Sequence, residues 1–146
     1  MDSPAASSQL WHHDPEDLKL VKVFIYLGAV DEGAGPFQYI PGSAGNGPYS
    51  RDFPWRPLGD TYPPEDQLFH RVSPSSVVSC VGPAGTIIFC NTSGFHRGGF
   101  ATTAPRTMAV YNYASPASLN SLARRNFRVA GPLPGSMTTA ARFALT

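Results

Sequence analysis

Residues 20–30 read Leu-Val-Lys-Val-Phe-Ile-Tyr-Leu-Gly-Ala-Val, which is the strongest strand signal in the chain. β-Branched and aromatic residues dominate this stretch, and both favour extended backbone. Successive side chains of a strand point to opposite faces, so its two faces can be compared. The aliphatic face consists of Val21, Val23, Ile25 and Leu27. The mixed face consists of Lys22, Phe24 and Tyr26. We expect the mixed face to line a cavity and the aliphatic face to need a cover.

The rest of the chain favours many short strands over long helices. With 146 residues and 42% hydrophobic content, it can form one domain with a real core. Its 15 prolines and 14 glycines separate short apolar runs. Further strands are expected at 8–14, 36–40, 67–72, 77–81, 86–90 and 107–113. The expected fold is therefore mainly all-β, an antiparallel sandwich or jelly roll with one short C-terminal helix.

The expected domain organisation is simple. Residues 1–7 form a disordered N-terminus, residues 8–114 the β core, and residues 115–146 a helix followed by a tail. The helix would begin at Ser115-Pro116, because serine is a common N-cap and proline is favoured at the first helical position. Residues 43–66 are too long for an ordinary loop and indicate an insertion that serves a site.

Charge and hydropathy exclude several classes of partner. The net charge is +1 and no basic stripe appears, which argues against a nucleic-acid partner. The longest apolar run, 23–30, is too short to span a membrane. No signal peptide is visible, so a cytoplasmic protein is expected. In that compartment Cys80 and Cys90 would be reduced and buried; a disulfide between neighbouring strands is the alternative.

The sequence Trp11-His12-His13-Asp14 predicts a metal site. His12 and Asp14 lie two residues apart and would point to the same side of an extended backbone. A second histidine, His96, would complete a set of two imidazoles and one carboxylate, which is typical of non-haem Fe(II) oxygenases. The alternative is a chance surface pair. His13 would point the other way and be packed or at the surface, and His70 has no companion motif.

Several other residues are candidates for binding at this site. Arg106 precedes the strand at 107–113 and is suited to hold a carboxylate, although it can also be a surface arginine. Arg97 adjoins His96 and would point away from the metal. Lys22 can bind a carboxylate or substrate, or can be a solvated edge charge. Trp11 is expected in the core, and Trp55 is placed to cover a substrate.

These motifs together resemble a known family. In order, they are Trp11-His12-His13-Asp14, the run Gly-Pro-Phe-Gln-Tyr-Ile-Pro-Gly-Ser at 35–43, Gly-Thr-Ile-Ile-Phe at 85–89, His-Arg-Gly-Gly at 96–99, and Arg106. Over residues 8–114 the chain resembles the phytanoyl-CoA dioxygenase (PhyH-like) family of Fe(II)/2-oxoglutarate oxygenases. The resemblance implies a double-stranded β-helix, also called a jelly roll.

The resemblance also implies roles for individual residues. Fe(II) would be held by His12, Asp14 and His96. The cosubstrate 2-oxoglutarate would be bound by Arg106, Phe24 and Lys22. Tyr26 and Trp55 would contact a small organic substrate. The implied reaction uses O2 to hydroxylate a C–H bond and forms succinate and CO2. Asp14 favours hydroxylation, because related halogenases lack this carboxylate.

Two departures from the family leave alternatives open. Ala44 stands where many members have a histidine, but that histidine is not a metal ligand. Members usually begin with a segment that covers the outer face of the major sheet, and residues 1–20 are too short to supply it. We therefore expect a truncated chain, or a homo-oligomer that covers the aliphatic face. The alternatives are a truncated, non-catalytic jelly-roll domain and a cupin-like metal protein that does not use 2-oxoglutarate, in which Arg106 would have no role.

Overall fold

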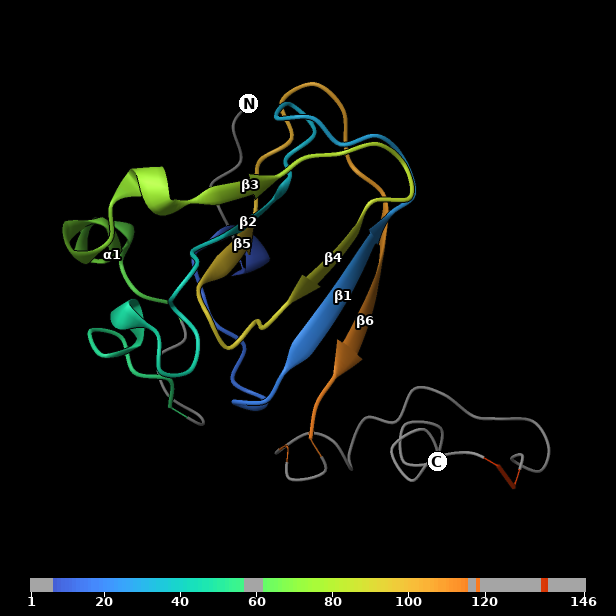
Figure 1. The fold of residues 1–146 in the computed structure, drawn as a ribbon. Coiled ribbons are helices and arrows are strands. Elements are labelled where there is room, and N and C mark those ends of the chain that lie inside the picture. Colours follow the sequence, from blue (N-terminus) through green and yellow to red (C-terminus); the bar gives the residue numbers. More distant parts are fainter. Residues whose placement is uncertain (1–6, 57–61, 116–117, 119–134, 137–146) are drawn as a thin grey trace.

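The computed structural model describes residues 7–56, 62–115, 118 and 135–136. Within these residues the chain forms two three-stranded antiparallel sheets and one α-helix (Figure 1). The expectation of a mainly β fold is confirmed. No helix in this part of the chain is long and apolar enough to cross a membrane.

The first sheet is built around the stretch with the strongest strand signal. β1 (Val21–Tyr26) lies between β4 (Ile87–Cys90) and β6 (Met108–Tyr113). Val23 stands opposite Phe89 on one side and opposite Tyr111 on the other. The strands predicted at 20–30, 86–90 and 107–113 are thus present. The first is shortened at both ends, and the other two each begin one residue later than predicted.

The second sheet has β2 (Phe37–Tyr39) between β3 (Val78–Cys80) and β5 (His96–Gly98). Strands at the places of β2 and β3 were predicted, but no strand was predicted where β5 lies. Gln38 and Tyr39 of β2 stand opposite Arg97 and His96 of β5. Pairing with β2 holds this short segment in the sheet despite its low intrinsic strand propensity.

The two sheets meet through the face of β1 that was predicted to be internal. The rings of Phe24 and Phe37 lie 4.4 Å apart between the sheets, and Cys90 joins them in one buried cluster. Tyr26 is also buried, on the same face of β1. The aliphatic face points outward: Val21 is 40% exposed and Leu27 60% exposed, whereas Val23 between its neighbouring strands is buried.

Two local predictions were wrong. Residues 67–72 were expected to be a strand, but they belong largely to α1 (Glu65–Arg71). Residues 8–14 were also expected to be a strand, but Ser7–Gln9 forms a 3-10 turn, and the only bridge in this stretch pairs His12 with His96. The helix and tail predicted for 115–146 and the disordered terminus predicted for 1–7 lie mostly outside the described residues.

A second core beside the β2 sheet anchors α1 and the strand-like segment that carries the first histidines. Trp11 is 2% exposed and packs with Ile40, Leu68, Val72 and Phe95. Its predicted place in the core is confirmed. This packing fixes the backbone on both sides of the candidate site, at His12 and at His96.

Candidate metal centre

Two backbone hydrogen bonds join the beginning of the chain to β5. The amide of His12 donates to the carbonyl of His96 at 3.0 Å, and the amide of His96 donates to the carbonyl of His12 at 2.9 Å. The amide of Asp14 then donates to the carbonyl of Thr92 at 2.9 Å. This short antiparallel pairing brings the first segment of the chain into direct contact with Thr92 and His96.

The three predicted ligands converge. His12, Asp14 and His96 are all buried, and one ligand atom from each lies within 4.8 Å of the others. Oδ2 of Asp14 is 3.6 Å from Nε2 of His96, and the two imidazole centroids are 4.2 Å apart. One ion can bridge such separations, because metal–ligand bonds of this kind are about 2.0–2.2 Å. The group can hold a metal ion.

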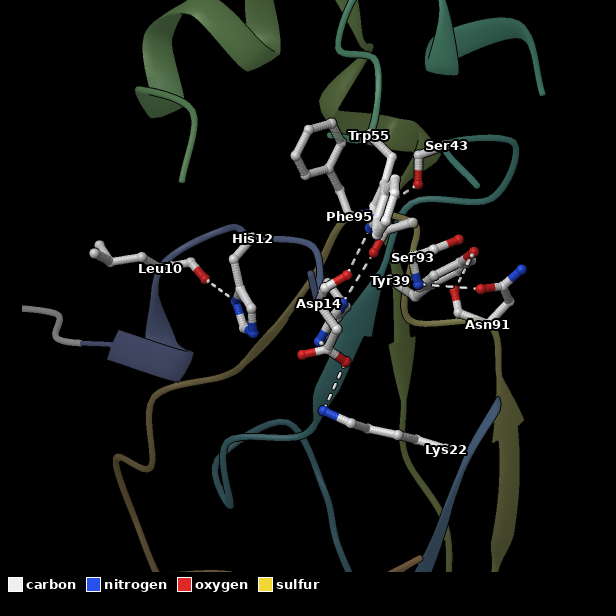
Figure 2. A network of polar contacts seen from close by, with 12 residues as sticks. Leu10, His12, Asp14, Lys22, Tyr39, Ser43, Trp55, Asn91, Ser93 and Phe95 are labelled. Atoms are coloured by element: carbon white, nitrogen blue, oxygen red, sulfur yellow. Dashed lines mark hydrogen bonds and ion pairs between the residues drawn. The ribbon is translucent and has the colours of Figure 1, made fainter. Parts of the chain in front are cut away.

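The hydrogen bonds of the two imidazoles suit metal binding. Nδ1 of His12 lies 2.8 Å from the carbonyl oxygen of Leu10, and Nδ1 of His96 lies 2.9 Å from that of Gly94. A carbonyl oxygen only accepts, so each Nδ1 must carry the proton. Each Nε2 then keeps its lone pair, which is the arrangement that backbone partners impose on metal-binding histidines. Figure 2 shows the Leu10 contact.

The electrostatics of the site favour neutral imidazole and an ionised carboxylate. Burial, together with the neighbouring His12, lowers the pKa of His96 to about 4. Burial raises the pKa of Asp14, but the nearby His96 and Lys22 outweigh this, so that pKa lies below its ordinary value. Both shifts favour the protonation states that bind metal, since metal ligands must be deprotonated.

Lys22 lies closer to the carboxylate than was expected. Its ammonium is 2.6 Å from Oδ2 of Asp14, in an ion pair whose lysine and aspartate side chains are only 19% and 8% exposed (Figure 2). The alternative of a solvated edge charge is therefore wrong. Whether this lysine also binds a cosubstrate stays a prediction.

Arg106 lies on the His96 side of β5. A Cβ placed on Gly98 would be 2.7 Å from Nη2 of Arg106, so the guanidinium fills the space that this glycine leaves. Residues 96 and 98 point to the same face of the strand, because they are two positions apart. The Arg106 side chain is half-buried, and its Nε has no hydrogen-bond partner within the described residues. Burial lowers the pKa of Arg106.

The long segment after β2 also reaches the site. Nε1 of Trp55 donates to the main-chain carbonyl of Asp14 at 2.8 Å (Figure 2). The ring of Tyr62 stacks on His12, with centroids 5.3 Å apart. Trp55 therefore supports the backbone of a candidate ligand; its predicted contact with substrate stays a prediction.

One supporting residue was missed by sequence reasoning. The buried hydroxyl of Ser43 donates to the carbonyl of Ile40 at 2.6 Å. The same oxygen accepts from the amide of Phe95 at 2.7 Å (Figure 2). It thus ties the end of β2 to the residue before His96. Ser43 could have been found from the sequence, because it belongs to the Pro-Gly-Ser motif that contributes to the family resemblance.

The remaining candidates have structural partners. The hydroxyl of Tyr26 donates to the carbonyl of Cys80 at 2.6 Å. His13 stacks on Phe95, and His70 is exposed, as expected of residues outside the site. Arg97 turns away from the cluster, forming an ion pair with Glu65 and lying over Trp11.

Both cysteines are free thiols, as the sequence favoured. Cys90 is buried and Cys80 is half-buried, on facing sheets. Burial raises the pKa of Cys90 to about 12, so this thiol stays protonated at neutral pH. Neither cysteine joins the candidate metal group.

Comparisons with known proteins provide no assignment: no family model and no curated protein matched the chain.

Proposed function

We propose that this chain is a non-haem Fe(II)/2-oxoglutarate-dependent dioxygenase of the PhyH-like family, which hydroxylates a C–H bond of a small organic substrate. The observation that carries the proposal is the buried group of two histidines and one carboxylate, His12, Asp14 and His96. This ligand set leaves one face of an iron ion open for other ligands. With iron bound, 2-oxoglutarate and O2 would supply the oxidising chemistry and leave succinate and CO2.

The protein would contribute ligand orientation and exclusion of water. His12 and His96 would each offer Nε2, and Asp14 would offer a carboxylate oxygen. The carbonyls of Leu10 and Gly94 hold the two imidazoles in the required tautomer. The ligands are 4–9% exposed, so little bulk water reaches them in this arrangement.

The surroundings of Arg106 support the use of an anionic cosubstrate. Its guanidinium lies over Gly98 on the face of β5 that also carries His96. The guanidinium is half-buried, and its Nη1 donates to the carbonyl of Gly99 at 3.4 Å, whereas its Nε has no partner among the described residues. Such a group suits the distal carboxylate of 2-oxoglutarate. Phe24 would form a wall of the space for 2-oxoglutarate. Its ring packs on Phe37, and the ring of Phe37 lies 5.6 Å from that of His96. A cupin-like protein without 2-oxoglutarate would have no use for this arginine.

The path of the chain supports a double-stranded β-helix. The chain starts in the first sheet with β1 and crosses to the second sheet for β2 and β3. It then returns to the first sheet for β4, crosses to the second for β5, and ends in the first with β6. The bridge between His12 and His96 extends the β5 edge of the second sheet. Such repeated crossing between two facing sheets is the pattern of a jelly roll.

A substrate would approach from the side of the long segment. An open hollow of about 620 Å³ is lined by Tyr62 together with Phe53, Phe95 and Arg56. Tyr62 also stacks on His12, so one ring belongs both to this hollow and to the surroundings of the candidate ligands. Aromatic walls with one arginine and one carboxylate, that of Asp52, suit a small organic substrate.

The test is anaerobic addition of Fe(II) and 2-oxoglutarate to the purified chain. We expect a weak visible charge-transfer band, followed by succinate formation after O2 is admitted. His96→Ala should abolish both signals. An absent band, or a band that His96→Ala leaves unchanged, would remove the proposal.

Arg106→Ala separates the dioxygenase from its alternatives. Loss of the guanidinium should weaken 2-oxoglutarate binding by about 1.5–3 kcal/mol, the range for a charge-assisted contact. Metal binding without any effect of 2-oxoglutarate would favour a cupin-like protein, and no metal binding would favour a non-catalytic domain.

A further inference from the structure

Lys22 brings a positive charge to the place where a metal ion would bind. Its ammonium is 2.6 Å from Oδ2 of Asp14, and the same oxygen is 3.6 Å from Nε2 of His96 (Figure 2). Oδ2 is thus the carboxylate oxygen that faces a candidate imidazole ligand. The ion pair and a metal ion would use the same oxygen.

The lysine is held in this place by the sheet. Lys22 lies in the central strand β1, opposite Cys90 of β4 and Asn112 of β6. Its backbone is therefore fixed from both sides, and its stem runs along the inner face towards Asp14 (Figure 2). The ammonium cannot leave the neighbourhood of the site without a change of side-chain rotamer.

The carboxylate needs this charge when no metal is bound. Asp14 is 6% exposed, and a buried, uncompensated carboxylate is strongly destabilising. The close ion pair with Lys22 is what compensates the charge of Oδ2 in this structure. A divalent ion that binds Oδ2 would have to displace the ammonium from it.

We propose that Lys22 is a positioning residue of the centre: it is the resident counter-ion that holds Asp14 in the metal-free protein, and it competes with a divalent metal ion for the same carboxylate oxygen. The inference rests on the proposed metal centre. It predicts that loss of the ammonium destabilises the empty protein and, at the same time, tightens metal binding. If Lys22 were purely structural, its loss would instead weaken metal binding, since a disturbed site binds metal less tightly.

The test measures Mn(II) binding by the electron paramagnetic resonance signal of the free ion and Co(II) binding by visible absorption. Thermal melts are recorded with and without Mn(II). The full chain is compared with Lys22→Met, with Lys22→Arg, which keeps the charge, and with Lys19→Met. Lys19 is an exposed lysine three residues earlier and serves as the matched control. No step of this test requires turnover.

We expect Lys22→Met to bind Mn(II) about tenfold more tightly than the unaltered chain, or more, because a competing positive charge has been removed. Its metal-free melting temperature should fall, and its gain in melting temperature on adding Mn(II) should exceed that of the unaltered chain. Lys22→Arg and Lys19→Met should stay within about twofold of the unaltered dissociation constant.

Equal or weaker Mn(II) binding by Lys22→Met would overturn the proposal while leaving the metal centre intact. If the unaltered chain binds neither ion in a manner that depends on His96, the proposed centre fails and this inference fails with it. Should Lys22→Met not fold, Lys22→Gln is measured in its place. Failure of both variants to fold even when refolded with Mn(II) also counts against a counter-ion that metal can replace.

Discussion

At the scale of single residues, His96 should make the stability of the metal-free protein depend on pH. Its pKa is lowered to about 4 in the folded protein by burial and by His12, from an ordinary value of 6.5. Between these two pH values the unfolded chain binds more protons than the folded protein. The contribution of His96 to the free energy of unfolding is therefore fully present above pH 6.5 and falls as the pH drops towards 4. The loss should reach about 3 kcal/mol. Denaturant unfolding with a chelator, from pH 7 to pH 4, measures it.

A flatter slope is expected for His96→Gln, because this variant has no imidazole to titrate. Only the slopes are compared, since the substitution also changes the absolute stability. Parallel slopes for the two proteins would show that another group carries the pH dependence. The lowered pKa of Asp14 adds a further loss only below about pH 4.

Gly98 should control the position of the guanidinium of Arg106. In Gly98→Ala the new Cβ would lie 2.7 Å from Nη2, so the arginine side chain must move. We expect the affinity for 2-oxoglutarate to fall about tenfold, while Mn(II) affinity stays within about twofold. Isothermal titration with each ligand checks both values. The matched control is Gly28→Ala, whose Cβ meets nothing within 4 Å; equal losses in both variants would contradict the role of Gly98.

At the scale of secondary-structure elements, Ser43 links the end of β2 to β5. In Ser43→Ala the buried amide of Phe95 loses its acceptor, which should cost about 1–3 kcal/mol of unfolding free energy. Because Phe95 precedes His96, metal affinity should fall as well. Urea unfolding and Mn(II) titration measure the two effects. Ser50→Ala is the control, since the Ser50 hydroxyl also donates to a main-chain carbonyl, away from the site. If Ser50→Ala lowers stability and metal affinity as much, the effect is not specific to the link between β2 and β5.

Elements were predictable where local pattern and tertiary pairing agree. The alternation in β1 gave both the strand and its inner face, because all three of its inner residues meet buried partners. Helix α1 was mistaken for a strand, although its acidic first turn and basic last turn are helix signals. The glycine-rich β5 carries little strand propensity, so only its pairing with β2 makes it a strand. No local pattern could have shown that.

At the scale of the whole molecule, the site was predicted better than its surroundings. The spacing of His12 and Asp14 and the distant His96 were enough to predict the cluster, because a metal centre restricts residue types strongly. The ion pair of Lys22 with Asp14 was not foreseen, because it depends on how far the first segment lies from β1. The stacking of Tyr62 on His12 likewise depends on the course of a long irregular segment, which has no periodicity to read.

The outward face of the β4–β1–β6 sheet carries several exposed apolar side chains. Its most exposed side chains are Val21, Leu27, Ile87, Phe89, Tyr111 and Tyr113. Contiguous apolar surfaces of this kind commonly take part in association. The homo-oligomer expected as one of two covers of the aliphatic face stays a prediction, and its contact would lie on this face.

Phe89→Ser should weaken that association, because Phe89 is 74% exposed and is the most exposed of these side chains. Burying a phenylalanine is worth about 1.5–3 kcal/mol, so the dissociation constant should rise by about tenfold to a hundredfold. Sedimentation velocity over a range of concentrations measures the shift towards monomer. Val81→Ser, at a residue 48% exposed beyond the end of β3, is the control and removes a smaller apolar group elsewhere. Association that Phe89→Ser leaves unchanged, or that Val81→Ser weakens equally, would place the contact on another surface. Because Phe89 points away from the candidate ligands, Mn(II) affinity should be the same in both variants.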